Sequence, residues 1–160
     1  MSGIDDASHF RAVAAAQARP GQPGPTFAAL ADALQALVGY KVMTILRLDT
    51  ATLRSVRLFS SEPSYPPGGT KQHRRGAWSA AIVDRRSYFL APRRDNVHRN
   101  FPDYQGIEAA GCASIVCLPV LYDGRCLATL NLWHVDGHYD AAAAERALPF
   151  ASLLVPACLA

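Results

Sequence analysis

The sequence has little charge, few cysteines and no long uninterrupted apolar run, and each scarcity excludes a class of protein. Charged residues make up 18% of the 160 residues and hydrophobic residues make up 50%, a balance typical of a folded soluble domain and unlike that of a disordered chain. Proline, serine and charge interrupt the apolar segments, so we expect no membrane-spanning helix. The start, MSGIDDASHF, has no apolar signal-peptide core, which predicts a cytoplasmic protein.

The cysteines lack the spacing of a metal or disulfide site. No C-x-x-C pair occurs, so we predict no zinc or other metal and no cofactor. On one strand Cys112 and Cys117 would lie about 17 Å apart, whereas a disulfide needs Cα atoms within about 7 Å. We therefore expect reduced, buried cysteines.

The basic residues are too few and too scattered to predict a nucleic-acid partner. The net charge is only +3, and a nucleic-acid-binding protein is expected to gather its basic residues on one face. The pentad KQHRR at residues 71–75 is interpreted as a solvated basic loop. Neither nucleic acid nor a membrane is therefore an expected partner.

Apolar periodicity and turn residues predict alternating helices and strands. The expected elements are helix 5–18, linker 19–25, a second helix capped by Thr26 and ended by Gly39, strands 40–49 and 53–61, loop 62–70, helix 77–86, strand 87–92, loop 93–103, helix 104–111, a hairpin, and a helix from Asp140 that kinks or breaks at Pro149 and Pro156. We divide the chain into an N-terminal helix with its linker, residues 1–25, and one domain, residues 26–160. This order predicts an α+β fold with helices on both faces of one sheet.

Residues 111–134, GCASIVCLPVLYDGRCLATLNLWH, predict a hairpin that turns at Asp-Gly. A two-residue loop would pair Tyr122 with Arg125, and a three-residue loop would pair Leu121 with Arg125. The choice decides which side chains share a face of the sheet. The two-residue register would bury threonine and asparagine beside valine and leucine, which is unfavourable unless the polar groups are paired. We therefore predict the three-residue loop.

The predicted register sorts the hairpin into two faces. Its apolar face consists of Val116, Leu118, Val120, Ala128, Leu130 and Leu132. Its other face, called the mixed face below, consists of Ile115, Cys117, Pro119, Leu127, Thr129, Asn131 and Trp133. In this register Cys117 and Cys126 point to opposite faces. Such a sheet packs helices on the apolar face and lines a cavity or a wetter core with the mixed face.

The hairpin resembles that of GAF domains. The matching residues are Ala113-Ser114, Pro119-Val120, Asp123-Gly124 and the run from Leu127 to Leu132, and the element order agrees over roughly residues 26–155. The loop SEPSYPPGGTK further resembles small bacterial proteins that consist of a GAF domain alone. The resemblance implies a GAF/PAS-like α+β fold, with a central antiparallel sheet, and a function as a small-molecule-binding sensor or signalling module.

The resemblance also implies a ligand site. In GAF domains that bind a ligand, the ligand lies between the sheet and the segment that crosses it, here residues 77–110, called the crossing segment below. The expected site residues are Cys117, Thr129, Asn131 and Trp133 on the sheet, and Trp78, Arg93, His98, Phe101 and Tyr104 on the crossing segment. Aromatic walls favour a planar ligand, and Arg93 favours an acidic group on it.

Two alternatives stay open beside the sensor. Free methionine sulfoxide reductases share the GAF fold and use cysteines, so a reductase acting through Cys112 or Cys117 is one alternative. The other is a dimerisation module without a ligand. No nucleophile–histidine–carboxylate set is suggested, so we assign no catalytic residue. The motifs of cyclic-nucleotide and bilin-binding GAF domains are absent from the sequence.

The C-terminal sequence predicts a homodimer. After Arg146, the stretch LPFASLLVPACLA has no charged residue, and a sheet covers only a stripe of about 100° on a helix. Six large apolar residues cannot share that stripe, so an exposed apolar patch is expected, and such patches usually mark interfaces. Those six are Leu148, Phe150, Leu153, Leu154, Val155 and Leu159. GAF domains commonly pair through their first and last helices, which agrees with this interface.

Overall fold

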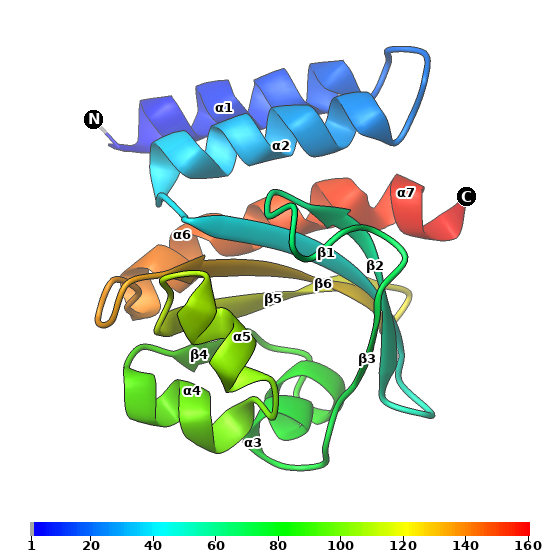
Figure 1. Ribbon diagram of the computed structural model, residues 1–160. Helices are drawn as coiled ribbons and strands as arrows, with labels where there is room; N and C mark the ends of the chain where they lie inside the picture. The colour runs from blue at the N-terminus through cyan, green and yellow to red at the C-terminus, as the bar shows by residue number, and fades with distance from the viewer. Residues whose placement is uncertain (1) are drawn as a thin grey trace.

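A six-stranded antiparallel sheet forms the centre of the protein, in the strand order β3-β2-β1-β6-β5-β4 (Figure 1). The computed structural model describes residues 2–160, and side chains from residue 5 onward. The strands are β1 (Val42–Asp49), β2 (Arg54–Ser60), β3 (Thr70–Gln72), β4 (Phe89–Ala91), β5 (Ser114–Tyr122) and β6 (Arg125–His134). The predicted fold class is confirmed, with helices on both faces of one antiparallel sheet.

The helices form two layers, one on each face of the sheet (Figure 1). The apolar face is covered by α1 (Ser2–Ala16), α2 (Gly24–Leu37), α6 (Ala141–Ala151) and, after a 3₁₀ turn over Ser152–Leu154, α7 (Val155–Leu159). The mixed face is covered by α3 (Ala77–Ser79), which continues as a π-helical turn over Ala80–Asp84, and by α4 (Arg94–Asn100) and α5 (Tyr104–Ala109). Each layer closes its own cluster of buried side chains against the sheet.

The division into two faces is confirmed, but the predicted turn is wrong. Tyr122 pairs with Arg125 across a two-residue turn, and both central residues of this turn have positive φ, as a type I′ turn requires. A β-bulge follows, because Leu121 pairs with Cys126 whereas Val120 pairs with Ala128. The extra residue shifts the register by one, so the apolar and mixed faces come out as predicted.

The bulge changes the position of one cysteine. Since Cys126 pairs with Leu121 before the bulge, it belongs to the same buried cluster as Cys117, contrary to the predicted opposite faces. All four cysteines are free thiols, and Cys112, Cys117 and Cys126 are buried. No group of three metal-ligating side chains occurs among the described residues.

The sequence analysis missed two elements. Two of the helices that it predicted also differ in the structure, one in its first residue and its cap and the other in its helix type. Residues 70–72 form β3 and residues 94–100 form α4, where loops were predicted. Thr26 does not cap α2, which begins at Gly24; its hydroxyl instead donates to the Gln22 side chain, 2.6 Å away. The predicted helix 77–86 is a short α-helix that widens into the π-helical turn.

The C-terminal helices lie between the sheet and the first two helices. Phe150 is buried and contacts the ring of Phe10 on α1 edge-on, with centroids 5.5 Å apart. The run Ala141–Leu159 is long and apolar enough to cross a membrane by length and composition, contrary to the sequence expectation. A core helix of a globular protein meets the same criteria, and here the apolar side of this run packs on the sheet.

Candidate functional site

A small cavity lies between the mixed face of the sheet and the crossing segment. Its volume is about 20 Å³, which is room for about one water molecule. The sheet contributes Thr44 and Leu46 from β1, Lys71 from β3, Ile115 and Cys117 from β5, and Asn131 and Trp133 from β6. The crossing segment contributes Trp78, Phe101 and Ile107, and His73 joins them from the residue that directly follows β3.

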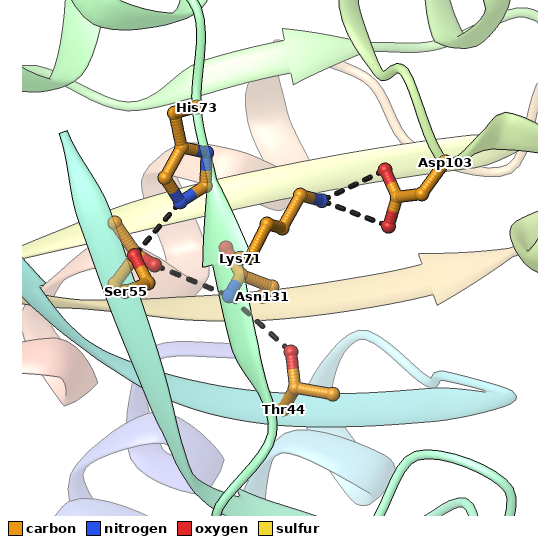
Figure 2. A network of polar contacts seen from close by, with 7 residues as sticks. Thr44, Ser55, Lys71, His73, Asp103 and Asn131 are labelled. Atoms are coloured by element: carbon orange, nitrogen blue, oxygen red, sulfur yellow. Dashed lines mark hydrogen bonds and ion pairs between the residues drawn. The ribbon is translucent and has the colours of Figure 1, made fainter.

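A polar group sits at the centre of the sheet floor. Asn131 is paired across the sheet with Thr44, so their side chains share the mixed face. The Asn131 amide donates to the hydroxyl of Thr44, at 3.3 Å (Figure 2), and to the hydroxyl of Thr129, at 3.2 Å. Its carbonyl oxygen has no protein partner among the described residues. The floor therefore offers a hydrogen-bond acceptor to whatever occupies the cavity.

An ion pair closes one side of the cavity. Lys71 reaches from the edge strand β3 toward Asp103, at the start of α5, and its Nζ lies 3.0 and 3.1 Å from the two carboxylate oxygens (Figure 2). The Lys71 side chain is only 16% exposed, and its Nζ also lies 5.1 Å from the centre of the Phe101 ring. This pair connects the sheet edge to the covering layer.

Beside this ion pair, a buried histidine supports the tryptophan wall. The His73 ring stacks on the Trp78 ring with centroids 4.0 Å apart, and its Nε2 lies 2.7 Å from the hydroxyl of Ser55. Burial, followed by the charge of Lys71, lowers the pKa of His73 from 6.5 to about 4. His73 is therefore neutral at neutral pH. Ser55 has no exposed surface, so this pair cannot present a nucleophile to a substrate.

The thiols at the site are poor nucleophiles. Burial raises the pKa of Cys117 to about 12, although Lys71 and a hydrogen bond from Trp78 oppose the shift. Burial likewise raises the pKa of Cys112 and raises that of Cys126 to about 11. Since the thiolate is the reactive form, almost none is present at neutral pH.

Five of the nine predicted site residues line the cavity, a sixth contacts one of these five, and three lie elsewhere. Trp78, Phe101, Cys117, Asn131 and Trp133 line it, and Thr129 is bonded to Asn131. The three that lie elsewhere are Arg93, His98 and Tyr104. Whether any of these residues contacts a ligand stays a prediction.

The three outlying residues have other contacts. Arg93 is exposed and forms an ion pair with Asp136, 3.3 Å away. His98 contacts the Glu108 carboxylate and packs against the Tyr104 ring in a tilted arrangement, with 4.2 Å between centroids. Tyr65, from the loop after β2, rather than Tyr104, packs edge-on against the Trp133 ring, with ring centroids 5.4 Å apart.

Sequence reasoning missed the charged part of the site. Lys71 and His73 were interpreted as part of a solvated loop because the prolines and glycines before them hid strand β3. The signal that was available is their spacing, since side chains two residues apart point to the same side of a strand. Thr44 was missed because β1 was not aligned with β6.

Comparisons with known proteins show what the arrangement is similar to. No family model and no curated protein sequence matches this chain. Among solved structures, the GAF domain of an Acinetobacter phosphoenolpyruvate-protein phosphotransferase superposes with a TM-score of 0.72 and 13% identity, covering 96% of this chain and 92% of that one. The chain has the GAF fold.

Two further structures with this fold have different roles. A methyl-accepting chemotaxis protein domain matches with a TM-score of 0.63 and 16% identity, covering 97% of this chain and 94% of that one. A free methionine-R-sulfoxide reductase from Neisseria meningitidis, solved in complex with its substrate, matches with a TM-score of 0.69 and 13% identity, covering 96% of this chain and 87% of that one. One fold thus supports both roles, so the fold by itself assigns neither role to this chain.

Proposed function

We propose that this chain is a sensor module that binds a small organic molecule between the mixed face and the crossing segment. The observation that carries the proposal is the buried group of Asn131, Thr44 and Lys71 around one cavity. Burying a polar group costs free energy unless it is paired, and an apolar floor would avoid that cost. Convergent polar groups among aromatic walls are the usual composition of a small-ligand site.

The charge at the site favours an acidic ligand. Lys71 supplies the positive charge that the sequence analysis assigned to Arg93, and its ammonium can bind a carboxylate or phosphate of the ligand as it binds Asp103. Trp78, Phe101 and Trp133 offer ring faces and edges for a planar group. The proposed ligand is therefore planar and acidic, with a donor group for Asn131.

The cavity must widen before such a ligand enters, since its present volume admits about one water molecule. We expect the Lys71–Asp103 ion pair to break when the cavity widens, because it joins the three-residue edge strand β3 to the layer of helices that covers the mixed face. An acidic group that takes the place of Asp103 on Lys71 would release the start of α5. Ligand binding would in this way move the covering layer relative to the sheet, which is the displacement a sensor needs.

The thiols argue against the reductase. A reductase of this kind needs a reactive thiolate, and burial raises the pKa of both Cys112 and Cys117. The dimerisation module without a ligand is supported by one observation, the small volume of the cavity. Ligand binding therefore decides between the sensor and this module.

Native mass spectrometry of the freshly purified chain tests the proposal. We expect a fraction of the protein to carry one additional small mass, and we expect Lys71→Met and Asn131→Leu to lose it. The matched control is Lys41→Met, which removes the same charge from an exposed lysine outside the cavity. If the unmodified protein carries no added mass and a screen of planar organic acids gives no thermal shift, the sensor is ruled out in favour of the dimerisation module.

A further inference from the structure

A second and larger hollow lies on the outer side of Trp78. It has a volume of about 360 Å³ and is formed by the segment that precedes and begins α3, residues 74–78, and by the segment from the end of α4 to the start of α5, residues 98–104. Figure 1 shows α3 and α4 side by side below the sheet. Trp78 lines both this hollow and the inner cavity, so the two spaces adjoin at this residue.

Positive charge converges on this hollow from two distant parts of the sequence. Arg74 and Arg75 come from the segment before α3, and Arg99 comes from the last turn of α4. Among the residues that the structure describes, no carboxylate side chain lines the hollow; Glu108 contacts His98, which lies at its rim. Guanidinium groups that line one hollow repel one another, and an anion bound between them would offset that repulsion.

The three arginines of the hollow differ from the other basic groups near them. Lys71, Arg93 and Arg94 each form an ion pair with a carboxylate. Among the described side chains, no carboxylate lies within ion-pair distance of Arg74, Arg75 or Arg99, and all three are exposed. They are therefore free to bind an anion from solution without first giving up a protein partner.

We propose that this hollow binds a phosphorylated small molecule. The planar guanidinium fork matches the oxygens of a phosphate and binds two of them at once, and three such forks fit a group that carries more than one negative charge. The volume lies within the range of small-molecule sites, roughly 300–1,000 Å³. Tyr104, which lines the hollow, provides an aromatic ring for the rest of the ligand. The site is separate from the inner cavity and does not depend on the proposed function of that cavity.

Calorimetric titration of the full chain with inorganic pyrophosphate tests the site. Arg75→Gln and Arg99→Gln each remove one fork from a different segment that lines the hollow, and each is expected to weaken binding about tenfold or more, since hydrogen bonds between charged groups are the strong ones. The matched control is Arg85→Gln, which removes the same charge from an exposed arginine of the crossing segment that does not line the hollow. The control is expected to change affinity by about twofold or less. In a Trp133→Phe background, pyrophosphate should also quench the fluorescence of Trp78. Arg75→Gln and Arg99→Gln should weaken this quenching, and Arg85→Gln should leave it nearly unchanged.

Several results would overturn the proposal. Absence of binding heat with the unmodified chain would do so, and so would an equal loss of affinity in all three arginine variants, which indicates diffuse charge. Tighter binding of a single-stranded oligonucleotide, weakened equally by Arg85→Gln, would identify an open basic surface for nucleic acid instead. Circular dichroism of each variant separates a loss of binding from a loss of fold.

Discussion

His73 is a histidine that folding keeps neutral. It is 9% exposed, lies between the Ser55 hydroxyl and the Trp78 ring, and has a pKa lowered to about 4. Lys71 opposes its protonation, whereas Asp103 favours it. Because the unfolded chain binds a proton on this residue at higher pH than the folded chain does, acid pH favours unfolding.

The pH dependence of stability should show this residue. Above about pH 6.5 the histidine is neutral in both states and has no effect; between about pH 6.5 and 4 the free energy of unfolding should fall by up to about 3 kcal/mol. Urea unfolding at several pH values measures this change. His73→Gln should flatten the dependence in this window, and His9→Gln, at a partly exposed site on α1, should not. An unchanged slope in His73→Gln would contradict the assignment.

The residues that sequence reasoning placed correctly are those whose position follows from strand alternation. Asn131 and Cys117 share a face because of where they stand in β5 and β6, and that face could be predicted without a structure. Arg93 and His98 were placed by loop proximity alone, and here local contacts with Asp136 and Glu108 determine where their side chains lie. Charged side chains on short helices have several partners within reach, and sequence does not rank them.

At the scale of the element, one arginine attaches the first helix to the rest of the protein. Arg146 on α6 donates to the Asp6 carboxylate on α1, with contacts of 2.7 to 3.1 Å, and to the carbonyl of Leu37 at the end of α2, at 2.7 Å. The hydrogen bond from Arg146 is the main reason that the pKa of Asp6 is lowered. Three helices therefore meet at a single guanidinium group.

Removing this contact should loosen α1. Asp6→Asn is expected to lower the free energy of unfolding by about 0.5–1 kcal/mol, the usual range for a partly exposed ion pair. Arg146→Met should cost more, because it also leaves the Leu37 carbonyl without its donor. Hydrogen exchange of the α1 amides should rise in both variants. Glu145→Gln, a neighbouring exposed site, is the control, and an equal effect there would refute the specific role of the pair.

The hairpin and the two missed elements show why element boundaries are harder to predict than faces. The Asp-Gly turn formed as its type I′ preference dictates, and a bulge then restored the burial pattern, so both signals in the sequence were satisfied by one inserted residue. Strand β3 and helix α4 are too short for periodicity to identify. Within α4, Val97 is buried, and the side chain of Asn96 accepts from the backbone of Arg93 to begin the helix.

At the scale of the whole molecule, a single chain buries more of its apolar C-terminal run than the sequence analysis predicted. Phe150, Leu153 and Leu154 are all buried, since α1, α2 and the sheet cover this run from more than one side. Leu148 and Val155 pack partly against the same core, and Leu159 is 50% exposed. The apolar patch on which the dimer was predicted is therefore smaller than the sequence suggested.

The homodimer through the terminal helices stays a prediction that light scattering can decide. A mass of two chains at micromolar concentration, reduced to one chain by Leu159→Glu, would confirm it. The matched control is Leu121→Glu, which places the same charge at an exposed leucine of the sheet. A mass of one chain for the unmodified protein would show that the exposed apolar area is too small for a stable interface.

Both outer strands of the sheet are only three residues long. A strand of another chain that joined a sheet edge would find few free backbone donors and acceptors at either β3 or β4, and short edge strands are a known protection against edge-to-edge growth. Heating or crowding this protein should therefore yield amorphous precipitate before ordered fibres, because the long apolar strands β1 and β6 have a neighbour on both sides. The part of β5 that β4 does not pair, residues 118–122, includes Pro119, which has no backbone N–H to offer another strand.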